Sequence, residues 1–187
     1  MWRLKIRRPK TVWTEESFSR KLMRAMVKKS EPVLSQIARR VQELRSGRGL
    51  SQDQFARLVG CHRSQVSQVE RGVKNLSVDT IDRFAKALGV DAVSLLQTGP
   101  VVARDPRKAL SLRERVSRNV LALRSARGVA QDALSESAGL SRNYVSSLEV
   151  QKKNVALSHL EMLALALGVP LSELLASPES DAAVGHH

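Results

Sequence analysis

Cysteine and aromatic residues are both scarce in this chain. Cys61 is the sole cysteine among 187 residues, so neither an intrachain disulfide framework nor a zinc site of several cysteines can form. Aromatic side chains make up 3% of the sequence, which disfavours a β-sandwich, because its strands are rich in aromatic and β-branched residues. Leu, Ala, Arg and Val are all abundant instead, and we expect an all-α fold.

Long apolar segments are also absent. The sequence has no run of about 18 consecutive apolar residues, the length that a membrane-spanning helix needs. Its opening MWRLKIRRPK carries charges where a signal peptide would need an apolar core. We therefore expect a soluble protein without a membrane anchor, and the single cysteine suits a reducing cytoplasm.

Acidic residues are outnumbered by basic ones. The chain has 31 Lys and Arg against 18 Asp and Glu, a net charge of +13. Residues 1–32 alone carry ten Lys and Arg against three Asp and Glu. This excess predicts an anionic partner, although charge alone does not choose between nucleic acid and an anionic membrane surface.

An internal repeat is present at an offset of 79 residues. LRSGRGLSQDQFARLVG (44–60) aligns with LRSARGVAQDALSESAG (123–139), and the register holds from Gln36/Arg115 to Leu96/Leu175 with 23 identities in 61 pairs. The repeat predicts two copies of one small domain, which sets the domain organisation. We expect a basic extension (1–32), a first domain (33–97), a linker (98–109), a second domain (110–176) and a flexible tail (177–187) that could carry a tag remnant.

Each copy is predicted to fold into five short helices. Ser51 and Gln54 have the spacing of a capping box at the start of a second helix, and Gly60 supplies the turn that follows it. A third helix is expected from about His62 to Glu70. In the second copy Ala130 takes the place of Ser51 and has no side-chain oxygen with which to cap a helix. The core residues expected there are Val116, Val120, Leu123, Leu134, Ala138, Val145, Leu148, Leu160, Leu163, Leu167 and Leu174.

A helix, a glycine turn and a second helix rich in hydrogen-bonding side chains are typical of helix-turn-helix DNA-binding proteins. The segment SQDQFARLVGCHRSQVSQVERGVKNLSVDTIDRFAKALGV (51–90) resembles the phage repressor/Cro family, also called the XRE family. The second copy keeps several of its elements, namely Gln131, Gly139, Val145, Glu149 and Ala166 to Val169. The resemblance implies two tandem five-helix lambda-repressor-like domains that bind a double-stranded DNA operator and control transcription, with repression favoured. It also implies a bacterial, phage or mobile-element setting, with the protein on the nucleoid.

Candidate DNA contacts follow from the way a recognition helix enters the major groove, which is by its N-terminal end. In the first copy they are His62, Arg63, Ser64, Ser67 and Gln68; in the second they are Ser141, Arg142, Asn143, Ser146 and Ser147. Gln52 and Gln131 resemble the phosphate-contacting glutamine of the family. Glu70 and Glu149 carry the wrong charge for DNA, so we expect them to bond groups within the motif. Cys61 aligns with Leu140 and is interpreted as a small core residue.

The role of the second copy stays open. It has Val150 and Gln151 where the first copy has Arg71 and Gly72. It could be a second DNA reader, because the 14 residues from Gln97 to Leu110 could extend to about 45 Å and reach a half-site about 34 Å away. Alternatively, it could serve dimerisation or bind a protein partner, as in an antitoxin or antiactivator in which DNA binding is secondary.

Catalysis is not expected. Cys61 and His62 are neighbours at the start of a helix, where their side chains point apart, so they form a poor nucleophile–base pair. No phosphate-binding loop is present, and Gly47-Arg48-Gly49 lacks the strand-to-helix context of a dinucleotide site. We therefore predict no enzyme activity, no cofactor and no metal site.

The N-terminal extension has two readings. Residues 1–8 alternate apolar and basic side chains, as a strand would, and residues 14–29 have an amphipathic helical pattern. The segment could be a basic arm that contacts phosphates or a minor groove. It could equally pack on the first copy, or on a second chain in a homodimer.

Deletion of residues 1–12 tests the basic-arm hypothesis. If the arm binds phosphates, the slope of log K against log salt concentration should become shallower by about 0.9 for each phosphate that the shortened chain no longer neutralises. Titrations of the full and shortened chains on one duplex at several salt concentrations measure that slope. An unchanged slope would show that the arm does not touch DNA, and a loss of dimerisation would instead favour packing on a second chain.

Overall fold

The structure, a computed structural model, describes residues 32–97, 99–104 and 110–177. The strand and helix predicted for the N-terminal extension therefore lie outside the described residues, as do linker positions 98 and 105–109 and the tail after residue 177.

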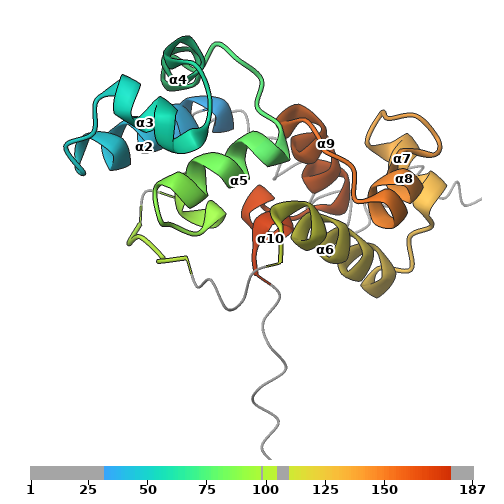
Figure 1. The fold of residues 1–187 in the computed structure, drawn as a ribbon. Coiled ribbons are helices and arrows are strands. Elements are labelled where there is room, and N and C mark those ends of the chain that lie inside the picture. Colours follow the sequence, from blue (N-terminus) through green and yellow to red (C-terminus); the bar gives the residue numbers. More distant parts are fainter. Residues whose placement is uncertain (1–31, 98, 105–109, 178–187) are drawn as a thin grey trace, which may run out of the picture. The chain divides into compact units, whose positions relative to one another are not determined.

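Both copies are helical (Figure 1). The first contains α2 (Val33–Ser46), α3 (Gln52–Val59), α4 (Arg63–Glu70), α5 (Val78–Ala87) and the 3₁₀ helix η1 (Ala92–Leu95); the second contains α6 (Leu112–Ala126), α7 (Gln131–Ser137), α8 (Tyr144–Gln151), α9 (Leu157–Leu167) and α10 (Leu171–Leu175). The all-α prediction is confirmed, since β-pairing among the described residues is limited to two isolated bridges. None of the described helices combines the length and apolar character that a bilayer crossing requires.

The two copies differ in how the first turns of α3 and α7 are capped. Ser51 Oγ accepts a hydrogen bond from the Gln54 backbone N–H at 3.1 Å, and Gln54 Oε1 accepts one from the Ser51 N–H at 2.8 Å, which is the predicted capping box. Ala130 provides no such cap to α7. There the Asp132 carboxylate accepts a bond from the Ala133 N–H at 2.9 Å, so one N–H at the start of the helix is satisfied in another way.

The predicted core residues are buried. Phe55 and Phe84 meet edge to face in the first copy, with ring centroids 5.3 Å apart. Two expectations need correction in detail. The fifth element of the first copy is a 3₁₀ helix, begun by an Asp91 side-chain cap, and Leu123 is half-buried against the core instead of lying within it.

The two copies contact each other directly, and both belong to one compact unit of the chain. A β-bridge joins Ser77, just before α5, to Ala156, just before α9. Arg115 of α6 donates to Asp91 at 2.6 Å, and both residues are buried. Arg113 of α6 pairs with Asp79 of α5, and this guanidinium lowers the pKa of the Asp79 carboxyl.

The first part of the predicted linker folds back on the first copy. The Asp91 N–H donates to Val102 O at 2.9 Å, and the Arg104 N–H donates to Gly89 O at 3.2 Å. Arg104 also bonds Asp82 through their side chains at 3.1 Å. Residues 99–104 therefore do not contribute to the extended span of about 45 Å that the sequence allowed.

Substitution of the two aligned cap positions gives a matched stability test. Ser51→Ala removes one side of an intact capping box and should lower the free energy of unfolding by about 1 kcal/mol. Ala130→Ser should raise it by less, because the Ala133 N–H already has the Asp132 carboxylate as a partner. Urea denaturation followed by circular dichroism measures both changes, and equal and opposite effects would contradict this account of the α7 start.

Candidate nucleic-acid interface

The helix-turn-helix of the first copy consists of α3, the turn at Gly60 and α4. Gly60 has φ +71°, a left-handed conformation that glycine adopts without strain, and it reverses the chain between the two helices. His62, Arg63 and Ser64 are exposed at the start of α4, while Ser67 and Gln68 are partly exposed one turn further on. The structure therefore places four of the five predicted contacts on α4 and the fifth, His62, at its N-cap.

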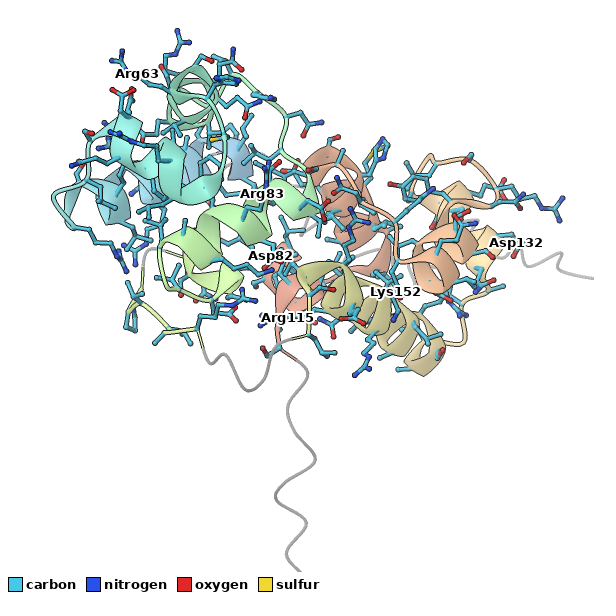
Figure 2. The ribbon with its side chains drawn as sticks, in the orientation of Figure 1. Arg63, Asp82, Arg83, Arg115, Asp132 and Lys152 are labelled. Atoms are coloured by element: carbon cyan, nitrogen blue, oxygen red, sulfur yellow. The ribbon has the colours of Figure 1, made fainter. Side chains whose placement is uncertain are left out.

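Arg63, at the start of α4, has an exposed guanidinium (Figure 2). Its side chain is 65% exposed, and its Nε lies 3.6 Å from the Asp53 carboxylate. An exposed ion pair at that distance is weak, so the guanidinium can leave Asp53 at little cost for a stronger partner. A guanine edge offers such a partner, because O6 and N7 accept two parallel hydrogen bonds from arginine.

The second copy repeats this geometry with one local change. Arg142 is 83% exposed and lies 3.6 Å from Asp132, as Arg63 does from Asp53. However, α8 begins at Tyr144, so Ser141, Arg142 and Asn143 precede the helix in a turn in which the Tyr144 N–H donates to Ser141 O at 2.8 Å. Ser146 and Ser147 lie on the helix and are partly exposed.

Glu70 connects three helices of the first copy. Its carboxylate accepts bonds from Arg45 of α2 at 2.5 and 3.0 Å and from the Gln52 amide of α3 at 2.9 Å. Arg45 also donates to Leu50 O at 2.6 Å, just before α3. The Glu70 side chain is only 4% exposed, so this residue bonds within the motif, as the sequence predicted.

The same group of bonds occurs in the second copy. Glu149 accepts from Arg124 at 2.9 and 3.0 Å and from the Gln131 amide at 2.6 Å, and Arg124 donates to Val129 O at 2.9 Å. In both copies one N–H of the glutamine amide is engaged by the glutamate, which leaves the other as a potential donor. Gln52 and Gln131 are thereby held at the N-termini of α3 and α7, where backbone N–H groups favour phosphate.

The surfaces around the two recognition helices differ in charge. Arg57 and Arg71 of the first copy align with Glu136 and Val150 of the second, and all four residues are exposed. Asp132 and Glu136 of α7 line a pocket together with Leu140 and Arg142 of the turn that follows it. Arg57 and Arg71 were not among the predicted contacts. The alignment of the two copies does signal them, because the second copy has no basic residue at either position.

Tyr144 is a further difference, and the sequence pattern did not signal it. Its hydroxyl lies 2.9 Å from His159 Nδ1, its ring packs edge to face on His159, and Lys153 Nζ lies 4.1 Å from the ring centroid. Burial raises the pKa of the Tyr144 hydroxyl. In the first copy Gln65 and Thr80 occupy the corresponding positions. The aromatic contact is therefore present at α8 and has no counterpart at α4.

Cys61 is partly buried in the turn before α4 and packs against the core, as does its counterpart Leu140. Burial raises the pKa of the Cys61 thiol. Within the described ranges no cluster of His, Cys, Asp and Glu has the arrangement of a metal site.

Both copies match known families of helix-turn-helix domains. Residues 36–96 match a family model described as a helix-turn-helix domain, and residues 120–174 match a second, described as helix-turn-helix. A hypothetical transcription factor of Neisseria meningitidis serogroup B is 40% identical over 68 residues, which cover 36% of this chain and 64% of that protein. The chain thus spans slightly less than two thirds of the length of this relative.

Two further relatives are control proteins. C.BamHI of Bacillus amyloliquefaciens is 40% identical over 58 residues, covering 30% of this chain and 72% of its own. C.SmaI of Serratia marcescens is 36% identical over 66 residues, covering 35% and 79%. Among solved structures, the hypothetical transcription factor from Neisseria is 36% identical, with 44% of this chain and 91% of its own covered and a TM-score of 0.37.

Replacement of Glu70 tests the structural role of its bonds. Glu70→Gln removes the charge that balances the nearly buried Arg45, and should lower the free energy of unfolding by about 2 to 3 kcal/mol. Glu149→Gln is the matched change in the second copy and should act similarly on Arg124. Denaturant unfolding of both variants checks this, and a change below about 0.5 kcal/mol would show that the buried ion pair does not secure the motif.

Proposed function

The chain belongs to the helix-turn-helix family, and from this we propose that it is a sequence-specific, double-stranded DNA-binding transcriptional regulator that represses transcription at an operator. This family membership agrees with the expectation that the protein is not an enzyme.

One observation carries the proposal. In each copy an exposed arginine precedes or begins the recognition helix, and a glutamine of the preceding helix is held by a buried glutamate of that same recognition helix. The glutamine N–H can then meet a phosphate while the arginine reaches a base edge, so one rigid unit offers both a positioning contact and a specifying contact.

Electrostatics supports the same assignment. The net charge of +13 attracts the duplex, and neutralisation of phosphates by Lys and Arg releases counterions, which makes binding sensitive to salt. Arg57 of α3 and Arg71 after α4 are exposed and add positive charge to the first copy, whereas the second copy has Glu136 and Val150 at these positions. We infer that the first copy contributes more of the affinity.

Repression is the direction of regulation that the resemblance to phage repressors favours. A protein bound to an operator that overlaps a promoter excludes RNA polymerase from it. Repression of this kind requires no enzymatic step. A reporter fused to the bound promoter should lose expression when the chain is supplied in trans. Increased expression would overturn repression and leave DNA binding intact.

Arg63→Ala tests the assigned reading contact. Loss of a bidentate bond to guanine should weaken operator binding by about 1 to 3 kcal/mol and relax the preference at one base position. Arg118→Ala is the control, because it removes one exposed positive charge from α6, outside either helix-turn-helix. Titrations on duplexes carrying each base at each position measure both effects.

Two outcomes would contradict the proposal. Unchanged affinity and preference in a folded Arg63→Ala variant would show that α4 does not read bases. A purified chain that fails to bind any duplex at physiological salt would favour the rival function, in which the domains bind a protein partner.

A further inference from the structure

The central contacts between the two copies are related by an approximate two-fold axis. The β-bridge pairs Ser77 with Ala156, which is its own counterpart at the repeat offset of 79. On one side of the bridge the Val78 N–H donates to Val155 O at 2.8 Å; on the other, the Leu157 N–H donates to Leu76 O at 2.6 Å. Exchange of the two copies turns one bond into the other, as at the interface of a symmetric dimer.

Two asparagine side chains next to the bridge contact equivalent positions of the opposite copy, although through different groups. Asn75 Nδ2 donates to Ser158 Oγ at 3.0 Å, and Asn154 Oδ1 accepts from the Asp79 N–H at 3.1 Å. Asn75 aligns with Asn154, and Asp79 aligns with Ser158. The two copies of one chain are therefore paired as two subunits of a homodimer would be.

Two ion pairs break this symmetry, and they show that the pairing is specific to unlike copies. Arg115 binds Asp91, and Arg113 binds Asp79. The first copy has Gln36 and Leu34 where the second has these arginines, so neither ion pair could form between two first copies. The second copy has Pro170 and Ser158 in place of the two aspartates, so two second copies would lack them too.

The symmetry also relates the two recognition helices. The bridge follows α4 by seven residues and α8 by five, so the pseudo-two-fold axis at the bridge relates α4 of the first copy to α8 of the second. Duplex DNA has two-fold axes of its own, and dimeric helix-turn-helix proteins align with such an axis to enter two major-groove segments.

The two reading surfaces are similar but not identical. Arg63 aligns with Arg142 and Ser67 with Ser146, whereas Ser64 aligns with Asn143 and Gln68 with Ser147. Arginine suits guanine, and asparagine or glutamine suits adenine. Each half-site should therefore share one guanine contact, and each should carry an adenine preference that the other lacks.

We propose that one chain acts as a built-in asymmetric dimer, and that it reads an operator of two unlike half-sites related by an approximate two-fold axis. This inference rests on the proposed function, whose substrate class it narrows. In this arrangement the second copy takes the place that a second subunit has in a homodimer.

The test exchanges reading residues between the copies. The full chain first selects its operator from a pool of random duplexes, and native mass spectrometry counts the chains on each duplex. The double variant Ser64→Asn with Asn143→Ser then exchanges one reading side chain between the copies. Ser125→Asn, an exposed change at the end of α6, is the control for an added amide away from both recognition helices.

We expect one chain per duplex and two unlike half-sites. The exchanged variant should prefer the operator in which the corresponding bases have moved to the opposite half-site, by about 5- to 100-fold over the original. The control should keep the original preference, and circular dichroism should show unchanged helical content for all chains.

Other results would overturn the inference in distinguishable ways. A perfect palindrome bound by two chains would show that the operator is read by a homodimer, with the proposed function intact. A single half-site, unaffected by Asn143→Ser alone, would leave the second copy without a reading role. Failure to enrich any sequence would overturn the proposed function together with the inference.

Discussion

A buried carboxylate at the end of each recognition helix holds the motif together. Glu70 and Glu149 each bind an arginine of the first helix and a glutamine of the second helix of their copy. A buried ion pair adds little net stability over well-packed apolar residues, but removal of one partner is costly because the other charge stays buried. Its effect is therefore one of geometry, since α4 and α8 can take few positions against α3 and α7 without breaking these bonds. The relative position of the glutamine amide and the exposed arginine follows from that restriction.

The pairing of the copies adds a second constraint. Two backbone hydrogen bonds around the pseudo-two-fold axis form one symmetric pair, and two asparagine bonds join equivalent positions through different groups, while the ion pairs of Arg113 and Arg115 occur once each. A duplicated domain that paired only through the symmetric bonds could pair equally well with a like copy. The arginines of the second copy and the aspartates of the first favour pairing between unlike copies.

Much of this could be read from the sequence, for identifiable reasons. The repeat register, the capping box at Ser51 and the buried role of Glu70 depend on local spacing or on comparison of the two copies. The late start of α8 and the 3₁₀ form of η1 were not predicted, because element ends depend on tertiary contacts that local patterns do not encode.

The pairing of the copies was also missed. Its central bonds are between backbone groups, which carry no side-chain signal, and Arg115 lies 24 residues from Asp91. The linker length allowed an extended span of about 45 Å, whereas residues 99–104 bond back to the first copy.

Hydroxyl-radical footprinting on a promoter fragment tests most directly the claim that both copies read DNA from one paired unit. The account predicts two protected patches on one face of the duplex, their centres about one helical turn or about 10 base pairs apart, with stronger protection on the half-site of the first copy. Arg142→Ala should weaken the second patch and leave the first in place. A single patch that does not respond to Arg142→Ala would contradict the claim and leave α8 without a role at the DNA.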